Sequence, residues 1–204
     1  MRRLDRPVER AVRLLVGLVL FGSGLAVLVR ADLGFDPWTV LSDGLRQVTD
    51  LTLGQLTVAT SLVVLLLWIP LRERPGVGTL ANALLVGVVL DLGVRVLPPV
   101  TDLLARGALL VLAVALVAVG TGLYVGAGWG PGPRDGLMTG LARLGVPVAL
   151  ARGGIEVSVL LVGWLLGGSV GVGTLVFALG IGPLVGLVMP RLVIRPRPAG
   201  DARA

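Results

Sequence analysis

A glutamate and an arginine lie inside one of the most apolar parts of the sequence. Glu156 is about ten residues into the apolar stretch 147–167, and Arg152 precedes it by four positions. Four residues make about one helical turn, so the two side chains share a helix face and can pair. A charge near the bilayer centre is expensive and usually marks a substrate or proton site. The alternative is a buried pair that only fixes helix packing.

A second acid, Asp91, lies about two-thirds of the way along the apolar stretch 77–94, four residues before Arg95. This order of acid and base favours a pair along one helix face. Because Asp91 is closer to the end of its stretch, its carboxylate can reach the membrane interface. A packing role therefore competes with a role in substrate binding.

Two glycine-rich turns have the same sequence, Gly-Val-Gly-Thr, at Gly76–Thr79 and Gly171–Thr174. Each opens an apolar stretch. Free backbone N–H groups at a helix start can hold an anion, and glycine leaves them accessible. Alternatively, Thr79 and Thr174 are N-cap residues behind flexible glycines.

A third such turn, Gly132-Pro-Arg-Asp, adds a fixed cation, Arg134, and an acid, Asp135, in the first turn of a predicted short helix. Arg134 is either a binding residue or a loop arginine at the cytoplasmic face. Asp36 precedes Pro37 at the start of another predicted short helix, as an N-cap residue would. The candidate substrate-binding residues are Glu156, Arg152, Arg134, Asp135, Asp36, Asp91, Thr79 and Thr174.

The composition excludes much other chemistry. The 204 residues include no cysteine and no histidine, so thiolate, disulfide and histidine chemistry are absent. All 18 basic residues are arginine, which excludes lysine Schiff bases and a P-loop lysine. We therefore expect no enzyme activity, no metal and no cofactor. The net charge of +6 comes from arginines at predicted helix ends, so we expect no nucleic-acid partner.

The hydropathy pattern predicts an integral membrane protein. Hydrophobic residues make up 55% of the chain and charged residues only 15%, with a mean hydropathy of +0.95. A spanning helix needs about 20 apolar residues. Six stretches qualify: 11–29, 51–70, 77–94, 104–126, 147–167 and 171–190.

Two further stretches, 37–48 and 133–144, look helical but are too short to span the bilayer. They predict re-entrant or interfacial helices. The arginines indicate the orientation, because thirteen fall in segments on the N-terminal side of the membrane and three (Arg30, Arg46 and Arg95) in the opposite loops. We therefore expect both termini, including the tail 191–204, to be cytoplasmic. The thirteen are Arg2, Arg3, Arg6, Arg10, Arg13, Arg72, Arg74, Arg134, Arg143, Arg191, Arg195, Arg197 and Arg203.

The two halves of the chain resemble each other. Residues 31–45 align with 127–141 with six of fifteen positions identical, and 75–92 align with 170–187 with nine of eighteen identical. Repeat 1 (1–100) and repeat 2 (101–190) each contain three spanning helices and one short helix. Three crossings are an odd number, so the second repeat must be inverted, as in many secondary transporters. A duplication that merely builds a stable bundle is the alternative.

Several of these blocks resemble the bacterial YczE/YyaS/YitT-type membrane proteins, and the YczE branch most closely. The sequence differs from that branch at Thr39, where the branch often has an acid. It also lacks the soluble C-terminal domain of YitT-type members. The resemblance implies a multi-pass protein of the bacterial cell membrane and no particular substrate. It rests on Ala31–Trp38, Pro75–Leu80, Gly130–Gly136, Gly171–Leu175, Arg152, Glu156 and Gly163–Gly167.

The sequence thus predicts an all-α membrane protein with two inverted three-helix repeats. We expect a transporter-like function for a small anionic or zwitterionic solute bound between the repeats. One alternative is a non-transporting assembly or regulatory partner that binds another copy or another membrane protein through glycine faces. Another is a substrate-binding subunit of a multicomponent transporter. The glycine pairs are Gly122/Gly126, Gly136/Gly140, Gly163/Gly167 and Gly182/Gly186.

Overall fold

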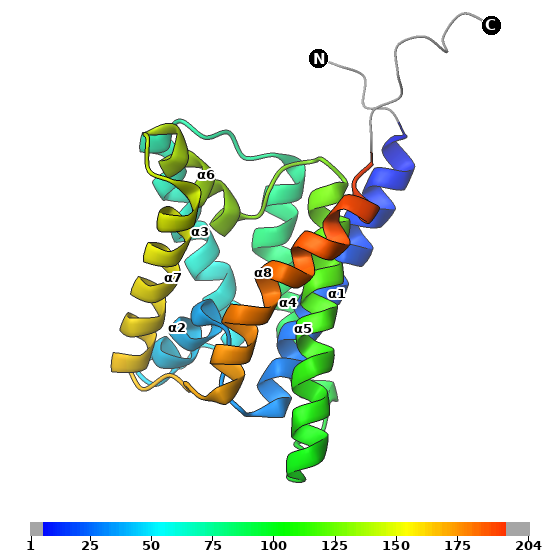
Figure 1. The fold of residues 1–204 in the computed structure, drawn as a ribbon. Coiled ribbons are helices and arrows are strands. Elements are labelled where there is room, and N and C mark those ends of the chain that lie inside the picture. The colour runs from blue at the N-terminus through cyan, green and yellow to red at the C-terminus, as the bar shows by residue number, and fades with distance from the viewer. Residues whose placement is uncertain (1–5, 195–204) are drawn as a thin grey trace, which may run out of the picture.

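The computed structural model describes residues 6–194, and every regular element among them is a helix (Figure 1). Six of the eight helices are long and apolar enough to cross a membrane, as predicted, and α2 and α6 are the two short ones. The predicted tail begins later than expected, because α8 continues to Leu192; Arg2, Arg3, Arg195, Arg197 and Arg203 lie outside the described residues. The helices are α1 (Pro7–Ala31), α2 (Pro37–Arg46), α3 (Leu53–Leu71), α4 (Val77–Val96), α5 (Leu103–Gly126), α6 (Pro133–Arg143), α7 (Val148–Leu165) and α8 (Val172–Leu192).

Side-chain caps determine where several helices start. The Asp36 carboxylate accepts a hydrogen bond from the Thr39 N–H at 3.4 Å, so Asp36 is the N-cap of α2, as predicted. In α3, the Thr52 hydroxyl accepts from the Gln55 N–H while the Gln55 side chain accepts from the Thr52 N–H. These caps satisfy N–H groups that have no partner within the helix.

The antiparallel helices α1 and α5 form the most extensive helix pair of the fold. They approach closely at two glycines: a Cβ on Gly17 would lie 2.6 Å from the Tyr124 backbone nitrogen, and one on Gly120 would lie 2.7 Å from the Gly17 carbonyl oxygen. Only glycine allows backbones to pack at this distance, which is a common device in membrane helices. Helix α4 packs against α1, and helix α8 packs against α5.

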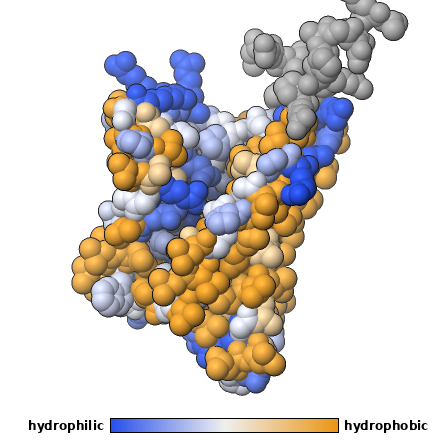
Figure 2. All heavy atoms as spheres, viewed as in Figure 1, coloured by the Kyte–Doolittle hydropathy of each residue, from blue (hydrophilic) through white to orange (hydrophobic). Residues whose placement is uncertain are grey.

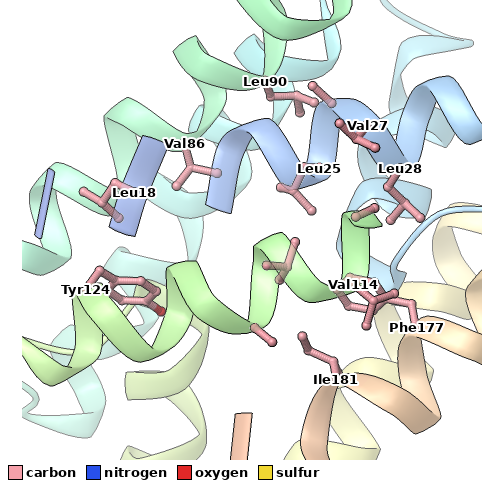
Figure 3. Close-up of a cluster of buried hydrophobic side chains, with 14 of the residues drawn as sticks. Leu18, Leu25, Val27, Leu28, Val86, Leu90, Val114, Tyr124, Phe177 and Ile181 are labelled. Atoms are coloured by element: carbon pink, nitrogen blue, oxygen red, sulfur yellow. The ribbon is translucent and has the colours of Figure 1, made fainter. Parts of the chain in front are cut away.

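Apolar side chains from these four helices make the main core (Figure 3). Leu18, Leu25 and Leu28 of α1 are almost completely buried. This core packs α1 against α5 along their lengths, and α4 and α8 pack on this pair. The neighbouring side chains shown in the figure are Val86 and Leu90 of α4, Val114 and Tyr124 of α5, and Phe177 and Ile181 of α8.

The short helices pack across the molecule rather than against their sequence neighbours alone. Helix α2 packs against α7, where Gly163 faces the backbone of Leu41. Helix α6 packs against α3, where Gly136 faces the Trp68 ring and the Trp68 indole N–H donates to the Pro133 carbonyl at 3.0 Å. Each short helix is thereby held by a spanning helix from the other half of the chain.

Candidate functional site

A cavity of about 560 Å³ lies among all eight helices. Its volume is in the usual range for small-molecule sites. Figure 2 shows hydrophilic atoms inside a hollow of an otherwise hydrophobic face, between the regions that α7 and α8 occupy in Figure 1. The charged side chains that line it are Asp36, Arg134, Asp135, Arg152 and Glu156.

The first turns of the two short helices meet inside this cavity. Arg134, the second residue of α6, lies with its Nη1 atom 3.6 Å from Asp36 Oδ2 at the start of α2. Its guanidinium carbon is 4.8 Å from the centre of the Trp38 ring, a cation–π contact. Asp36 is 2% exposed, yet its Oδ1 atom has no hydrogen-bond donor among the described residues. The Asp36 carboxylate is thus buried beside the cationic Arg134 side chain.

Arg134 carries a fixed positive charge at the centre of the molecule. Burial lowers the pKa of its guanidinium, and the neighbouring carboxylates of Asp36 and Asp135 raise that pKa again. Arginine is protonated in proteins at any physiological pH, so the charge remains. The structure thus places Arg134 inside the cavity and not in a cytoplasmic loop, because α6 enters the bundle with its N-terminus first.

The next acid, Asp135, accepts a hydrogen bond from the Tyr124 hydroxyl at 2.9 Å. Tyr124 is the only tyrosine in the chain, and Asn82, the only asparagine, also lines the cavity. Both lie in apolar spanning helices, and neither was among the predicted site residues. Their rarity within such helices is the sequence feature that indicates them.

The predicted pair in α7 is present and faces the cavity. The Arg152 Nε atom donates to Glu156 Oε1 at 3.1 Å. The two side chains are 46% and 24% exposed, respectively, although they lie on a spanning helix. Charges are unstable in contact with hydrocarbon, so this face of α7 requires water, a ligand or another part of the protein beside it.

Comparison with known proteins identifies the family. Residues 8–190 match the family of unknown function DUF6198. The chain belongs to this family. The chain is 32% identical over 180 residues to the uncharacterized membrane protein YczE of Bacillus subtilis, covering 87% of this chain and 84% of YczE. It is 40% identical over 173 residues to an uncharacterized protein of Haemophilus influenzae, covering 84% of this chain and 79% of that protein.

These relatives confirm the resemblance to the YczE branch and a multi-pass membrane protein with bacterial homologues. No solved structure matches the chain. The position of the charged cavity in this DUF6198 protein is therefore known from the structure of this chain alone.

Three of the predicted binding residues lie away from the cavity. Asp91 caps the start of α3, because it accepts hydrogen bonds from the Gly54 N–H at 2.8 Å and from the Thr52 hydroxyl. Thr79 and Thr174 are the third residues of α4 and α8, so they are not the N-caps; their hydroxyls accept from the Gly76 and Gly171 N–H groups.

The second glycine of each Gly-Val-Gly-Thr turn is buried and contacts backbone of the other half of the chain. The Gly78 N–H donates to the Trp129 carbonyl at 2.9 Å, and the Gly173 N–H donates to the Leu33 carbonyl at 2.6 Å. A Cβ on Gly76 or Gly171 would collide with the same carbonyl groups. These N–H groups are therefore used in joining the two halves of this DUF6198 chain, which leaves them unsuited to an anion site.

Most of the predicted glycine faces are used within the chain. Gly122 and Gly126 face Leu192 of α8, and Gly140 faces Leu71. Gly182 and Gly186 of α8 differ, because a Cβ on either would meet nothing within 4 Å.

Proposed function

We propose that this chain is a transporter-like membrane protein that binds a small zwitterionic solute in its central cavity. The observation that carries the proposal is the enclosure of charges of both signs in a ligand-sized cavity between membrane-spanning helices. Intramembrane charges that face a bundle interior are characteristic of substrate and ion pathways. The proposal includes no catalytic step.

The charge balance favours a zwitterion over an anion. Two arginines and three carboxylates line the cavity, so its formal charge is −1 when all are ionised. A ligand with both an ammonium and a carboxylate group can satisfy both signs. The Asp36 and Glu156 carboxylates in the lining are suitable acceptors for the ammonium group, and Arg134 or Arg152 is a suitable partner for the carboxylate.

We further propose that the two halves are inverted repeats. Matching contacts at offsets of 95 or 96 positions support this arrangement. The Arg10 guanidinium donates to the Ala127 carbonyl at 2.6 Å, and the Arg106 guanidinium donates to the Ala31 carbonyl at 2.7 Å. Each contact joins the first turns of one long helix to the end of the other, which requires α1 and α5 to be antiparallel.

The turn contacts described above repeat in the same way. Trp129 is 96 positions after Leu33, and Gly173 is 95 positions after Gly78, so the two hydrogen bonds are counterparts. Gly34 and Gly130, also 96 positions apart, both have positive φ, at 103° and 118°. Sites in inverted-repeat proteins lie between the repeats. Helices of both halves line the cavity, in agreement with this arrangement.

The orientation with both termini in the cytoplasm belongs to this proposal, as does the bacterial cell membrane as location. The start of α1 and the end of α8 lie at one end of the bundle, where Arg13 Nη1 donates to the Leu192 carbonyl at 2.7 Å. Arg72, Arg74 and Arg143 adjoin the loops that the six-span topology puts on that same side, in agreement with the positive-inside rule.

A thermal-shift experiment tests the solute site. The purified protein is heated in detergent with amino acids, betaines, carboxylic acids and amines, and the same panel is applied to Glu156→Gln and Asp36→Asn. A ligand at a hundred times its Kd adds about 2.7 kcal/mol of stability, which is readily detected. Asp91→Asn is the matched control, because it removes an acid outside the cavity.

We expect a zwitterion to stabilise the wild-type and Asp91→Asn proteins but not the two cavity variants. A hit then justifies flux assays in proteoliposomes. If no compound shifts any folded variant, the proposed solute site is wrong.

One observation favours a second candidate function, a non-transporting assembly partner. An apolar groove of about 720 Å³ lies on the outside between α3 and α7, with Leu56, Val63, Leu67 and Val159 among its lining residues. A helix from a second copy of this chain or from another membrane protein fits such a groove. Native mass spectrometry from membranes tests this candidate directly.

A further inference from the structure

The spanning helices α3 and α4 pack tightly against each other. Helices α7 and α8, which align with them in the second half of the chain, do not. Helix α3 packs against α4 through Gly54 and Gly87, where a Cβ on either glycine would collide with the carbonyl oxygen of the other. The Val58 side chain is also part of this contact, 2.7 Å from the Cβ position of Gly87. Helices α7 and α8 form no comparable interface over their described lengths, and Figure 1 shows them apart.

The aligned positions in α7 and α8 have the small side chains that close packing needs. Gly87 aligns with Gly182, Gly54 with Ala149 and Val58 with Gly153, all at an offset of 95. Cβ atoms on Gly153 and Gly182 would meet nothing within 4 Å in this structure. Glycine in a helix interior costs about 1 kcal/mol relative to alanine, and here no visible contact requires it.

The space between α7 and α8 is also where the cavity opens. The Arg152 and Glu156 side chains lie partly exposed beside it, flanked by apolar helix surface. Helix α7 packs mainly against α2, and Ala151 and Gly163 are its only buried residues among those described. Moving α7 toward α8 would cover the two charges and use the small residues on both helices.

We propose that α7 closes onto α8 as α3 packs on α4, which seals the cavity in a second conformation of the protein. The proposal rests on the inverted-repeat arrangement and deepens the transport function proposed above. In this conformation Gly153 and Gly182 are in contact, as Val58 and Gly87 are in the structure described here. Closing one side of a site while the other side opens is how inverted repeats produce alternating access.

Cysteine cross-linking tests the closure. The chain has no natural cysteine, so only the introduced thiols react. The full-length Gly153→Cys/Gly182→Cys protein is oxidised with copper phenanthroline in native membranes, and unreacted thiols are counted by a maleimide–polyethylene glycol gel shift. A disulfide needs Cα atoms within about 7 Å, so it forms only if the helices approach. Neither substitution meets a neighbour in the open structure, so folding should be preserved.

The matched control is Val157→Cys/Leu179→Cys, about one turn along the same helices from the test pair, where the side chains are 64% and 76% exposed. Their aligned positions, Leu62 and Leu84, are exposed in the packed pair as well. We expect the Gly153/Gly182 pair to cross-link at least ten times faster than the control pair. Equal rates in two proteins that melt like the wild type overturn the closure.

The solute screen above separates the two proposals. If a zwitterion stabilises the protein but the test pair cross-links no faster than its control, the closure is wrong and the binding site stands. If the test pair cross-links while no solute binds, the closure stands and the zwitterion site fails.

Discussion

The guanidinium carbon of Arg134 lies 4.8 Å from the centre of the Trp38 ring. The two residues occupy the same position in the aligned segments 31–45 and 127–141, so aligned residues of the two halves contact each other in the cavity lining. The neighbouring carboxylate of Asp36 completes a small charged cluster. The aligned positions hold a cation in one half of the chain and an aromatic ring in the other. The side chains of the site are therefore asymmetric, although the backbone contacts around it are the same in both halves.

Replacing Arg134 with alanine should destabilise the protein by about 3 kcal/mol, because it leaves the buried Asp36 carboxylate without a cation. The measurement is the free energy of unfolding, from denaturant titration in detergent. Adding Asp36→Asn to Arg134→Ala should restore part of the loss, since the amide carries no charge. No recovery in the double variant would mean that the ion pair is not the source of the effect.

Glu156→Gln should change stability by less than about 1 kcal/mol, since ion pairs with this much exposure contribute little. The same substitution should abolish stabilisation by the bound zwitterion. A large loss of stability in the unliganded variant would instead support the packing role considered from the sequence. Thermal melting with and without solute distinguishes these outcomes.

Asp91→Asn should lower stability by about 1–2 kcal/mol, because it weakens the hydrogen bonds that cap α3 at Gly54 and Thr52. Its response to solute should equal that of the wild type. Loss of the solute response in a folded Asp91→Asn protein would show that this acid also serves the cavity.

Alanine at the aligned glycines Gly87 and Gly182 should have opposite effects. Gly87→Ala should cost about 1–3 kcal/mol, because the new methyl group collides with the Gly54 carbonyl. Gly182→Ala has open space and should be neutral or stabilising by up to about 1 kcal/mol. Melting temperatures of the two single variants test the contrast, and equal shifts would contradict it.

Single cysteines should report the proposed orientation. Thr49→Cys lies in the exposed loop between α2 and α3, and Leu144→Cys lies in the exposed loop between α6 and α7. A membrane-impermeant maleimide added to whole cells should label position 49 and leave position 144 unlabelled until the cells are opened. Labelling of both positions from one side would refute the inverted arrangement.

Much of the local structure follows from the sequence. The spanning helices follow from long apolar runs, and the start of α2 follows from the Asp36-Pro37 pair. Both signals are local in the sequence. The Arg152–Glu156 pair is also local, since four residues along one helix fix the distance. Membership of the family followed from short blocks of residues that span most of the chain.

Only the tertiary structure decided which polar residues meet. Asp36 and Arg134 are 98 positions apart, and their contact exists because two short helices enter the bundle from different halves of the chain. The same packing gave Asp91 a capping role and turned the Gly-Val-Gly-Thr segments against the opposite loops. Residue types and spacing determine the helices and a local cap such as Asp36 on α2, because those depend on neighbours in the chain. Whether a buried charge faces a cavity, a backbone N–H group or another helix depends on packing between distant segments.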